Sequence, residues 1–205
     1  MTVASPLFAA PVGFADSTMV MGEFSREFQQ LDAMYSPTAR YSLAATATHM
    51  RDPDEHRRLT LTTLHYNRLL WRSNSPQAQF NVYGTVGVGM SYANEAFDRD
   101  REQPHVSAAA QVDYETRRIY VAGKAHWWKA ERFIVGYHSL QAGFSFYPTA
   151  WDETQPWLIG EVSRMPGLSE DWSRAIYLRL INKGYFVEAG VDQDLRPRLN
   201  FRYTF

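Results

Sequence analysis

Apolar and polar residues alternate along many short segments of this chain, and the alternation restricts the folds open to it. From Phe80 to Tyr92, every second residue is aliphatic, aromatic or glycine, and most residues between them are small or polar. Side chains of a β-strand point alternately to two faces, so a period of two predicts strands with one apolar and one polar face. The segments 105–114 and 133–147 show the same period, and no long segment has the helical one. The pattern predicts an all-β protein built from a meander of strands.

The connections between these segments differ in length, which predicts that short turns gather at one end of the protein and longer loops at the other. Short turns are expected at residues 36–38, 74–77, 115–117 and 182–184, and longer charged loops at residues 51–57, 94–104, 164–171 and 192–197. Alternating short turns and longer loops are typical of transmembrane barrels, whose turns lie in the periplasm and whose loops lie outside the cell. Two connections fit less well, because residues 129–132 are short for a loop and residues 148–155 are long for a turn.

The number of strands depends on the N-terminal part of the chain. Ten strands can be counted backward from Phe205 to Ala39. Residues 17–35 add a hairpin if the chain turns at Ser25-Arg26-Glu27, and single-chain bacterial barrels have an even number of strands. We therefore predict twelve strands, with ten as the alternative if residues 17–35 do not form a hairpin in the wall.

Composition agrees with a barrel that meets lipid on one side and water on the other. Aromatic residues make up 15% of the 205 residues, yet the mean hydropathy is -0.40. No run approaches the roughly 18 apolar residues that a membrane-spanning helix needs. The net charge of -1 offers no basic face for nucleic acid, so no nucleic-acid partner is expected. The absence of cysteine excludes disulfides, thiolate metal sites and cysteine nucleophiles.

Residues 1–15 differ from the rest of the chain. They are apolar and small, and Gly13 and Ala15 stand where a signal peptidase prefers small residues, although no Lys or Arg precedes them. We expect residues 1–15 to be a residual signal peptide or an N-terminal segment outside the fold. Residues 16–205 are expected to form a single barrel domain.

The last strand has two sharply different faces. One face carries Leu199, Phe201, Tyr203 and Phe205, and the other carries Arg198, Asn200, Arg202 and Thr204. This suits a wall between lipid and a wet lumen. A terminal aromatic residue preceded by alternating apolar residues resembles the C-terminal signature of bacterial outer-membrane β-barrel proteins.

The resemblance implies a transmembrane antiparallel up-and-down β-barrel in the outer membrane of a Gram-negative bacterium. It also implies that the barrel-assembly machinery recognises the four apolar residues of the last strand, and that outer-membrane lipids and lipopolysaccharide surround the protein. The class contains pores, lipid-modifying enzymes, adhesins and assembly factors, so it does not imply one function. The pattern predicts no oligomeric state.

Six charged residues face the lumen under this assignment: Asp113, Lys124, Arg179, Glu188, Arg198 and Arg202. They either form a charge network that fills a narrow barrel or line a small pore. Barrels of about 8 strands fill their interior with side chains, whereas those of 16 or more leave a channel. Twelve strands lie between these cases, so the alternation leaves both interpretations open.

No motif points to catalysis or to a cofactor. His138 and Ser139 are adjacent on a strand and must point to opposite faces, so only a pair from different strands, such as Ser139 with His126, stays possible. No nucleophile elbow supports such a pair, and the six histidines lack metal-ligand spacing. We expect no catalytic residue, metal or cofactor.

The favoured hypothesis is a non-enzymatic, porin-like outer-membrane barrel that acts as a narrow channel or as a structural or accessory component of the envelope. One alternative is an outer-membrane hydrolase or acyltransferase that modifies lipid. The other is a soluble, lipocalin-like barrel whose apolar faces point inward.

Overall fold

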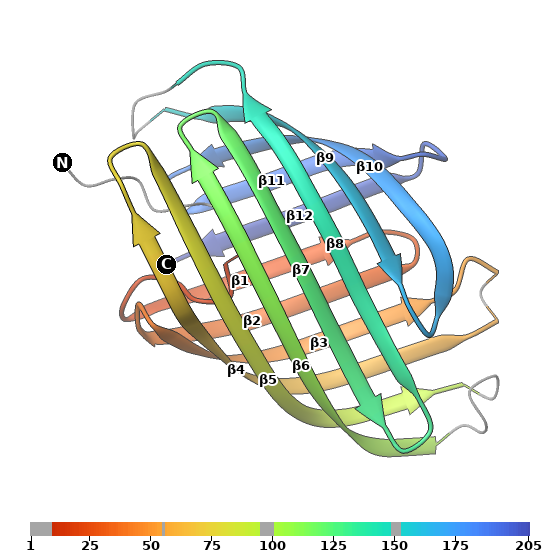
Figure 1. The fold of residues 1–205 in the computed structure, drawn as a ribbon. Helices are drawn as coiled ribbons and strands as arrows, with labels where there is room; N and C mark the ends of the chain where they lie inside the picture. The colour runs from red at the N-terminus through yellow and green to blue at the C-terminus, as the bar shows by residue number, and fades with distance from the viewer. Residues whose placement is uncertain (1–9, 55, 95–100, 149–152) are drawn as a thin grey trace.

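The computed structural model describes residues 10–54, 56–94, 101–148 and 153–205, and they form one closed barrel (Figure 1). The barrel consists of twelve strands: β1 (Ser17–Phe24), β2 (Phe28–Thr38), β3 (Tyr41–Arg51), β4 (Arg58–Asn74), β5 (Ala78–Ala93), β6 (Arg101–Thr116), β7 (Ile119–Ala130), β8 (Ile134–Ser145), β9 (Gln155–Met165), β10 (Ser169–Asn182), β11 (Tyr185–Asp192) and β12 (Pro197–Thr204). The predicted fold class and strand number are confirmed.

Every strand pairs antiparallel with its neighbours in the sequence, and β12 closes the barrel on β1. At this seam Gly22 lies opposite Phe201, and Thr18 and Phe205 exchange two backbone hydrogen bonds of 2.9 Å. The N-terminal hairpin turns at residues 25–27, where the backbone N–H of Ser25 donates to the carbonyl of Phe28 at 2.7 Å. Closure leaves the sheet without an unpaired edge.

The two faces of each strand separate as the alternation predicts. On β5 and β8, Val86, Val88 and Leu140 lie on the outside, each with more than half of its surface exposed. On β6, the inward side chains of His105, Ser107, Gln111 and Asp113 are buried in the lumen. A soluble barrel would reverse this distribution, because its apolar residues would fill the interior. No helix in the described part of the chain is long and apolar enough to cross a membrane.

Some predicted loops are shorter than the sequence suggested. Residues 101–104 extend β6 and pair with residues 90–93 of β5, and residues 164–165 and 169–171 belong to β9 and β10. The β9–β10 turn is therefore reduced to residues 166–168. Gly167 has a φ of 81°, and a Cβ atom there would lie 2.2 Å from the carbonyl oxygen of Ile134. Only glycine allows this turn to fold so closely against β8.

Candidate functional site in the barrel lumen

A cavity of about 110 Å³ lies in the middle of the lumen, and most of the residues that line it are polar. Its polar lining consists of Glu23, Gln30, Asp32, His65, Asn67, Thr85, Gln111, Lys124, His126, Tyr137, Ser139, Gln141, Glu161, Glu188 and Asn200. These side chains come from most of the strands, because inward positions of the whole wall meet there. The space suits a few water molecules or one small hydrophilic group.

An apolar cluster fills the lumen at the end where β2, β4 and β8 begin. It consists of Phe28, Met50, Leu59, Leu61, Ala93, Trp128, Ala130, Phe133, Val135, Tyr137 and Leu168. We call these residues the outer cluster, because this end carries the loops predicted to lie outside the cell. The ring of Phe28 stacks on that of Tyr137 with centroids 4.4 Å apart, which joins β2 to β8 across the lumen. The outer cluster therefore borders the central cavity, which Tyr137 also lines.

Two further contacts bridge the barrel near the outer cluster. The hydroxyl of Tyr137 donates to Glu23 Oε1 on β1 at 2.6 Å. Arg57, in the β3–β4 connection, donates to the carbonyls of Gly167 and Leu168 in the β9–β10 turn. Strands β3 and β4 lie on the opposite side of the barrel from β9 and β10, so Arg57 ties the two rims together.

The other end of the lumen holds part of the N-terminal segment. Ala10 and Val12 are buried and pack against Tyr83, and Leu69 joins them. The hydroxyl of Ser42 donates to the carbonyl of Pro11 at 2.5 Å, and the backbone N–H of Gly13 donates to Ser36 Oγ at 2.9 Å. We call residues 10–14 the N-terminal plug, because they occupy this mouth of the barrel.

The N-terminal plug separates two spaces. Pro11 borders the central cavity, whereas Ala10, Val12 and Phe14 border a second cavity of about 430 Å³ at the mouth. Arg72, Lys183 and Arg202 also line this second cavity. The interpretation of residues 1–15 as a residual signal stays a prediction, and residues 1–9 lie outside the described part of the chain. Where residues 10–14 are retained, they narrow the lumen.

All six charged residues predicted to face the lumen do point inward. Arg179 Nε lies 2.7 Å from Glu188 Oε1, and both side chains are almost fully buried. The Arg179 guanidinium also lies 4.4 Å from the centroid of the Tyr120 ring. Asp113 accepts a hydrogen bond of 2.7 Å from Asn81 Nδ2. These contacts favour the interpretation that the charged residues form a network along the wall of the lumen.

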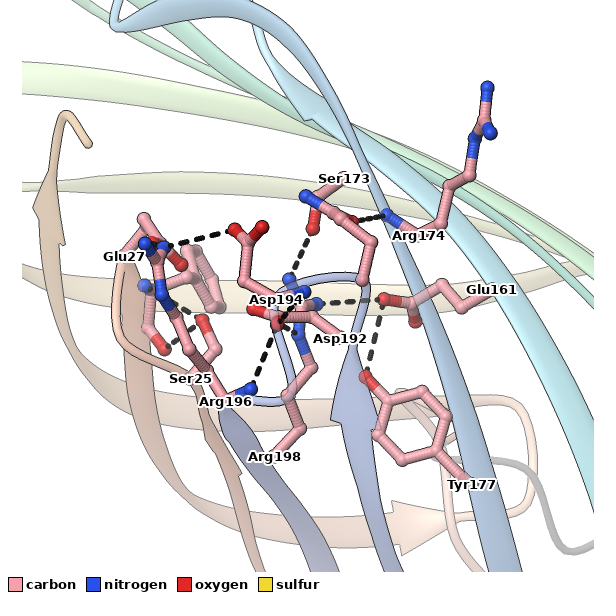
Figure 2. Close-up of polar contacts among 12 residues, drawn as sticks. Ser25, Glu27, Glu161, Ser173, Arg174, Tyr177, Asp192, Asp194, Arg196 and Arg198 are labelled. Carbon is pink, nitrogen blue, oxygen red and sulfur yellow. Dashed lines mark hydrogen bonds and ion pairs between the residues drawn. The ribbon is translucent and has the colours of Figure 1, made fainter.

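Arg198, on β12, contacts polar side chains of three other strands, as Figure 2 shows. Its Nη1 lies 3.3 Å from Glu161 Oε1 on β9, and its Nη2 donates to Ser173 Oγ on β10 at 2.5 Å. Its Nε is 4.0 Å from Asp192 Oδ2 on β11, and the Tyr177 hydroxyl donates to Glu161 at 3.3 Å. Two of the arginines in the lumen, Arg179 and Arg198, are thus held by carboxylates.

Three charged groups around the central cavity form no ion pair with any residue that the structure describes. Glu23 and Asp32 line the cavity and accept hydrogen bonds only from uncharged groups, namely the Tyr137, Gln30 and Thr46 side chains. Lys124 also lines it, and its ammonium group lies 5.6 Å from the centroid of the Tyr137 ring. Two acidic side chains and one basic side chain therefore line the cavity outside these ion pairs.

A chain of polar contacts that no motif predicted runs along β2 to β6. Thr46 Oγ1 donates to Asp32 Oδ1 at 2.6 Å, so this hydroxyl must accept from His65 Nδ1 at 3.0 Å. His65 Nε2 is then free to accept from Ser107 Oγ, also at 3.0 Å. Gly87 leaves room for this last contact, since a Cβ there would lie 2.5 Å from Ser107 Oγ.

This order of groups resembles an activated serine, but its position does not suit catalysis. Ser107 is buried and does not border the central cavity, so the network mainly satisfies polar groups in the lumen. The predicted alternative pair is also not formed: His126 and Ser139 both line the cavity, but no hydrogen bond joins them, and His126 stacks on Trp128 at 3.7 Å. His138 points outward, as expected from its position beside Ser139.

No protein-family model matches the sequence, and no curated protein matches it. Among solved structures, the chain resembles the KdgM porin, at 10% identity and a TM-score of 0.49 over 92% of this chain and 98% of that one. The KdgM porin in complex with disordered oligogalacturonate matches at 12% identity and a TM-score of 0.48, covering 92% and 99%. A loop L8 deletion mutant of OmpT, an outer membrane protein of Vibrio cholerae, matches at 7% identity and a TM-score of 0.36, covering 92% and 97%. These likenesses are too distant to carry a function to this chain.

Proposed function

We propose that this chain is an integral outer-membrane β-barrel whose lumen is a narrow passage for small hydrophilic solutes, closed in the conformation described. The observation that carries the proposal is the polar central cavity, which lies between the outer cluster and the N-terminal plug. A barrel that served only as a scaffold would have no need for a water-sized polar space with unpaired charges at its centre, since burying such charges is costly.

The outside of the barrel supports the membrane location. Its large apolar residues are exposed all around the wall, where only lipid can cover them. Aromatic residues gather at the end that carries the short turns, as in the girdles of barrels at a membrane boundary. The exposed members of this girdle include Tyr35, Trp71, Phe144, Phe146, Tyr185, Tyr203 and Phe205.

The N-terminal plug is the part of the closure that most readily moves. Residues 10–16 pair with no strand, and two hydrogen bonds hold the plug in place: Gly13 N–H donates to Ser36 Oγ, and the Ser42 hydroxyl donates to the carbonyl of Pro11. Such bonds stabilise a folded segment by about 0.5–1.5 kcal/mol each. Withdrawal of the plug would connect the central cavity with the cavity at the mouth.

Planar-bilayer recordings of two folded forms test this proposal. One form retains residues 10–15, and the other begins at Asp16, which is also the chain expected after cleavage behind Ala15. We expect rare, small currents from the first and larger, more frequent currents from the second. N-terminal sequencing of the protein isolated from membranes shows which form exists in cells.

A Ser42→Ala variant of the longer form serves as an intermediate case, because it removes the hydrogen bond to Pro11 and leaves the one between Gly13 and Ser36. It also removes the hydrogen bond that Ser42 Oγ accepts from Asn67 Nδ2 at 3.0 Å in the barrel wall. Its current should lie between those of the two forms. The absence of current from every folded form would contradict a passage. The protein would then be a structural barrel, a role with which the buried Arg179–Glu188 ion pair agrees.

A further inference from the structure

A group of basic and aromatic side chains lies on the outer wall of β7–β10, near the end that carries the outer cluster. Lys129, His138, Arg164 and Arg174 point outward here, together with Trp127 and Trp172. We call these six residues the basic patch. Residues that point outward from the middle of the wall beside it are small or apolar, such as Ala125, Leu140 and Val162.

The members of the basic patch form a continuous surface across four strands. His138 and Arg164 are direct partners in the β8–β9 register. The His138 ring lies 5.1 Å from that of Trp127, and the Arg164 guanidinium lies 5.4 Å from the centroid of Trp172. Lys129 lies at the edge of the basic patch on β7, two positions after Trp127 and therefore on the same face of the strand.

The cations of the basic patch have no acidic partner in the described part of the chain. No ion pair involves Lys129, Arg164 or Arg174, although Glu131, Glu170 and Asp171 lie in or beside the neighbouring turns. Arg174 points away from the Arg198 network, as Figure 2 shows. Arg164 Nε and His138 Nε2 are also shielded from solvent without any hydrogen-bond partner.

Unpaired cations on the lipid face need a compensating group. An arginine or lysine there costs about 2–4 kcal/mol at the bilayer midplane and about 0–1 kcal/mol near its boundary. Guanidinium groups bind phosphate through charge-assisted hydrogen bonds, and the flanking tryptophans favour the depth of the lipid headgroups. We infer that the basic patch binds the phosphate groups of a phosphorylated glycolipid of the outer leaflet.

The inference does not depend on a conducting lumen, because the patch lies outside the barrel. Lipid binding can be measured by native mass spectrometry of the full-length barrel in detergent, with lipid A carrying two phosphates and with the same lipid dephosphorylated. We expect the phosphorylated lipid to remain bound and the dephosphorylated lipid to be lost. The double variant Arg164→Gln/Arg174→Gln should bind the phosphorylated lipid roughly tenfold or more weakly, as the loss of charged hydrogen bonds implies.

Arg68→Gln is the matched control, since Arg68 also points outward and forms no ion pair with a described residue. It lies on β4 near the end of the barrel that carries the short turns, away from the basic patch. This variant should bind as the wild type does, and Arg164→Lys should retain most of the binding. Heat-modifiable migration on a gel confirms that each variant is folded, and Lys129→Gln provides a second test should Arg164→Gln fail to assemble. The inference would be overturned if the barrel retained both lipids equally, or if Arg68→Gln weakened binding as much as the double variant does. Binding of inorganic phosphate in the absence of lipid would also overturn it.

Discussion

At the scale of single residues, charge in the lumen is arranged in pairs that depend on both partners. Arg179 and Glu188 are 2.7 Å apart and almost fully buried, and the second oxygen of Glu188 accepts from Asn200 at 2.8 Å. Removing one member of such a pair leaves the other charge buried without its counterion, which costs more than the pair itself contributes. The Arg179 guanidinium also donates to Gln141 Oε1 at 3.1 Å and lies 4.4 Å and 5.0 Å from the ring centroids of Tyr120 and Phe186.

Glu188→Gln should therefore lower the free energy of unfolding by about 3–5 kcal/mol, whereas Arg179→Met/Glu188→Gln should lower it by less. Urea unfolding of the barrel in lipid vesicles, followed by tryptophan fluorescence, measures both values. Arg179→Met alone completes the cycle. If the double variant loses as much stability as the sum of the two single variants, the two charges do not act as a pair.

At the scale of elements, β7 shows how one strand serves two environments. Trp127 and Trp128 are adjacent, but Trp127 is 42% exposed on the lipid face and Trp128 is fully buried in the outer cluster. The same amino acid thus belongs to the membrane surface at one position and to the closure of the lumen at the next. The pair provides a direct comparison of the two roles.

Trp128→Ala should lower stability by about 3–5 kcal/mol, because it removes a large buried side chain and leaves a cavity. Since that cavity lies in the outer cluster, the variant should also increase the current through the barrel. Trp127→Ala should change the current little and cost less stability. Equal currents from the two variants would show that the outer cluster does not close the passage.

The same elements show what the sequence can and cannot predict. The faces of β5, β6, β8 and β12 followed from the period of two, because one face of each strand is consistently apolar. The count of twelve strands also needed the expectation of an even strand number, which made residues 17–35 a hairpin. The outer cluster could not be foreseen, since Leu59, Trp128 and Val135 are apolar residues on the lumen face and the pattern expects polar ones there. The N-terminal plug was also missed, because an apolar segment before the first strand has the composition of an export signal. The contact of His65 with Ser107 depends on register between strands far apart in sequence, and no local motif reveals it.

At the scale of the whole molecule, twelve strands enclose a lumen that side chains nearly fill. The outer cluster, the charged network and the N-terminal plug occupy successive parts of it and leave the central cavity between them. Around that cavity, and within the described ranges of the chain, two acidic side chains outside any ion pair, Glu23 and Asp32, outnumber the one such basic side chain, Lys124. Rings of acidic side chains favour cations in channels, so the passage should prefer cations and neutral solutes over anions.

The reversal potential of the form beginning at Asp16, recorded across a potassium chloride gradient, tests this claim most directly. The lumen should select potassium over chloride, Glu23→Gln/Asp32→Asn should reduce or reverse the preference, and Lys124→Gln should strengthen it. Selection of chloride by the unmodified lumen, or currents whose selectivity does not respond to these three residues, would contradict a passage through the central cavity.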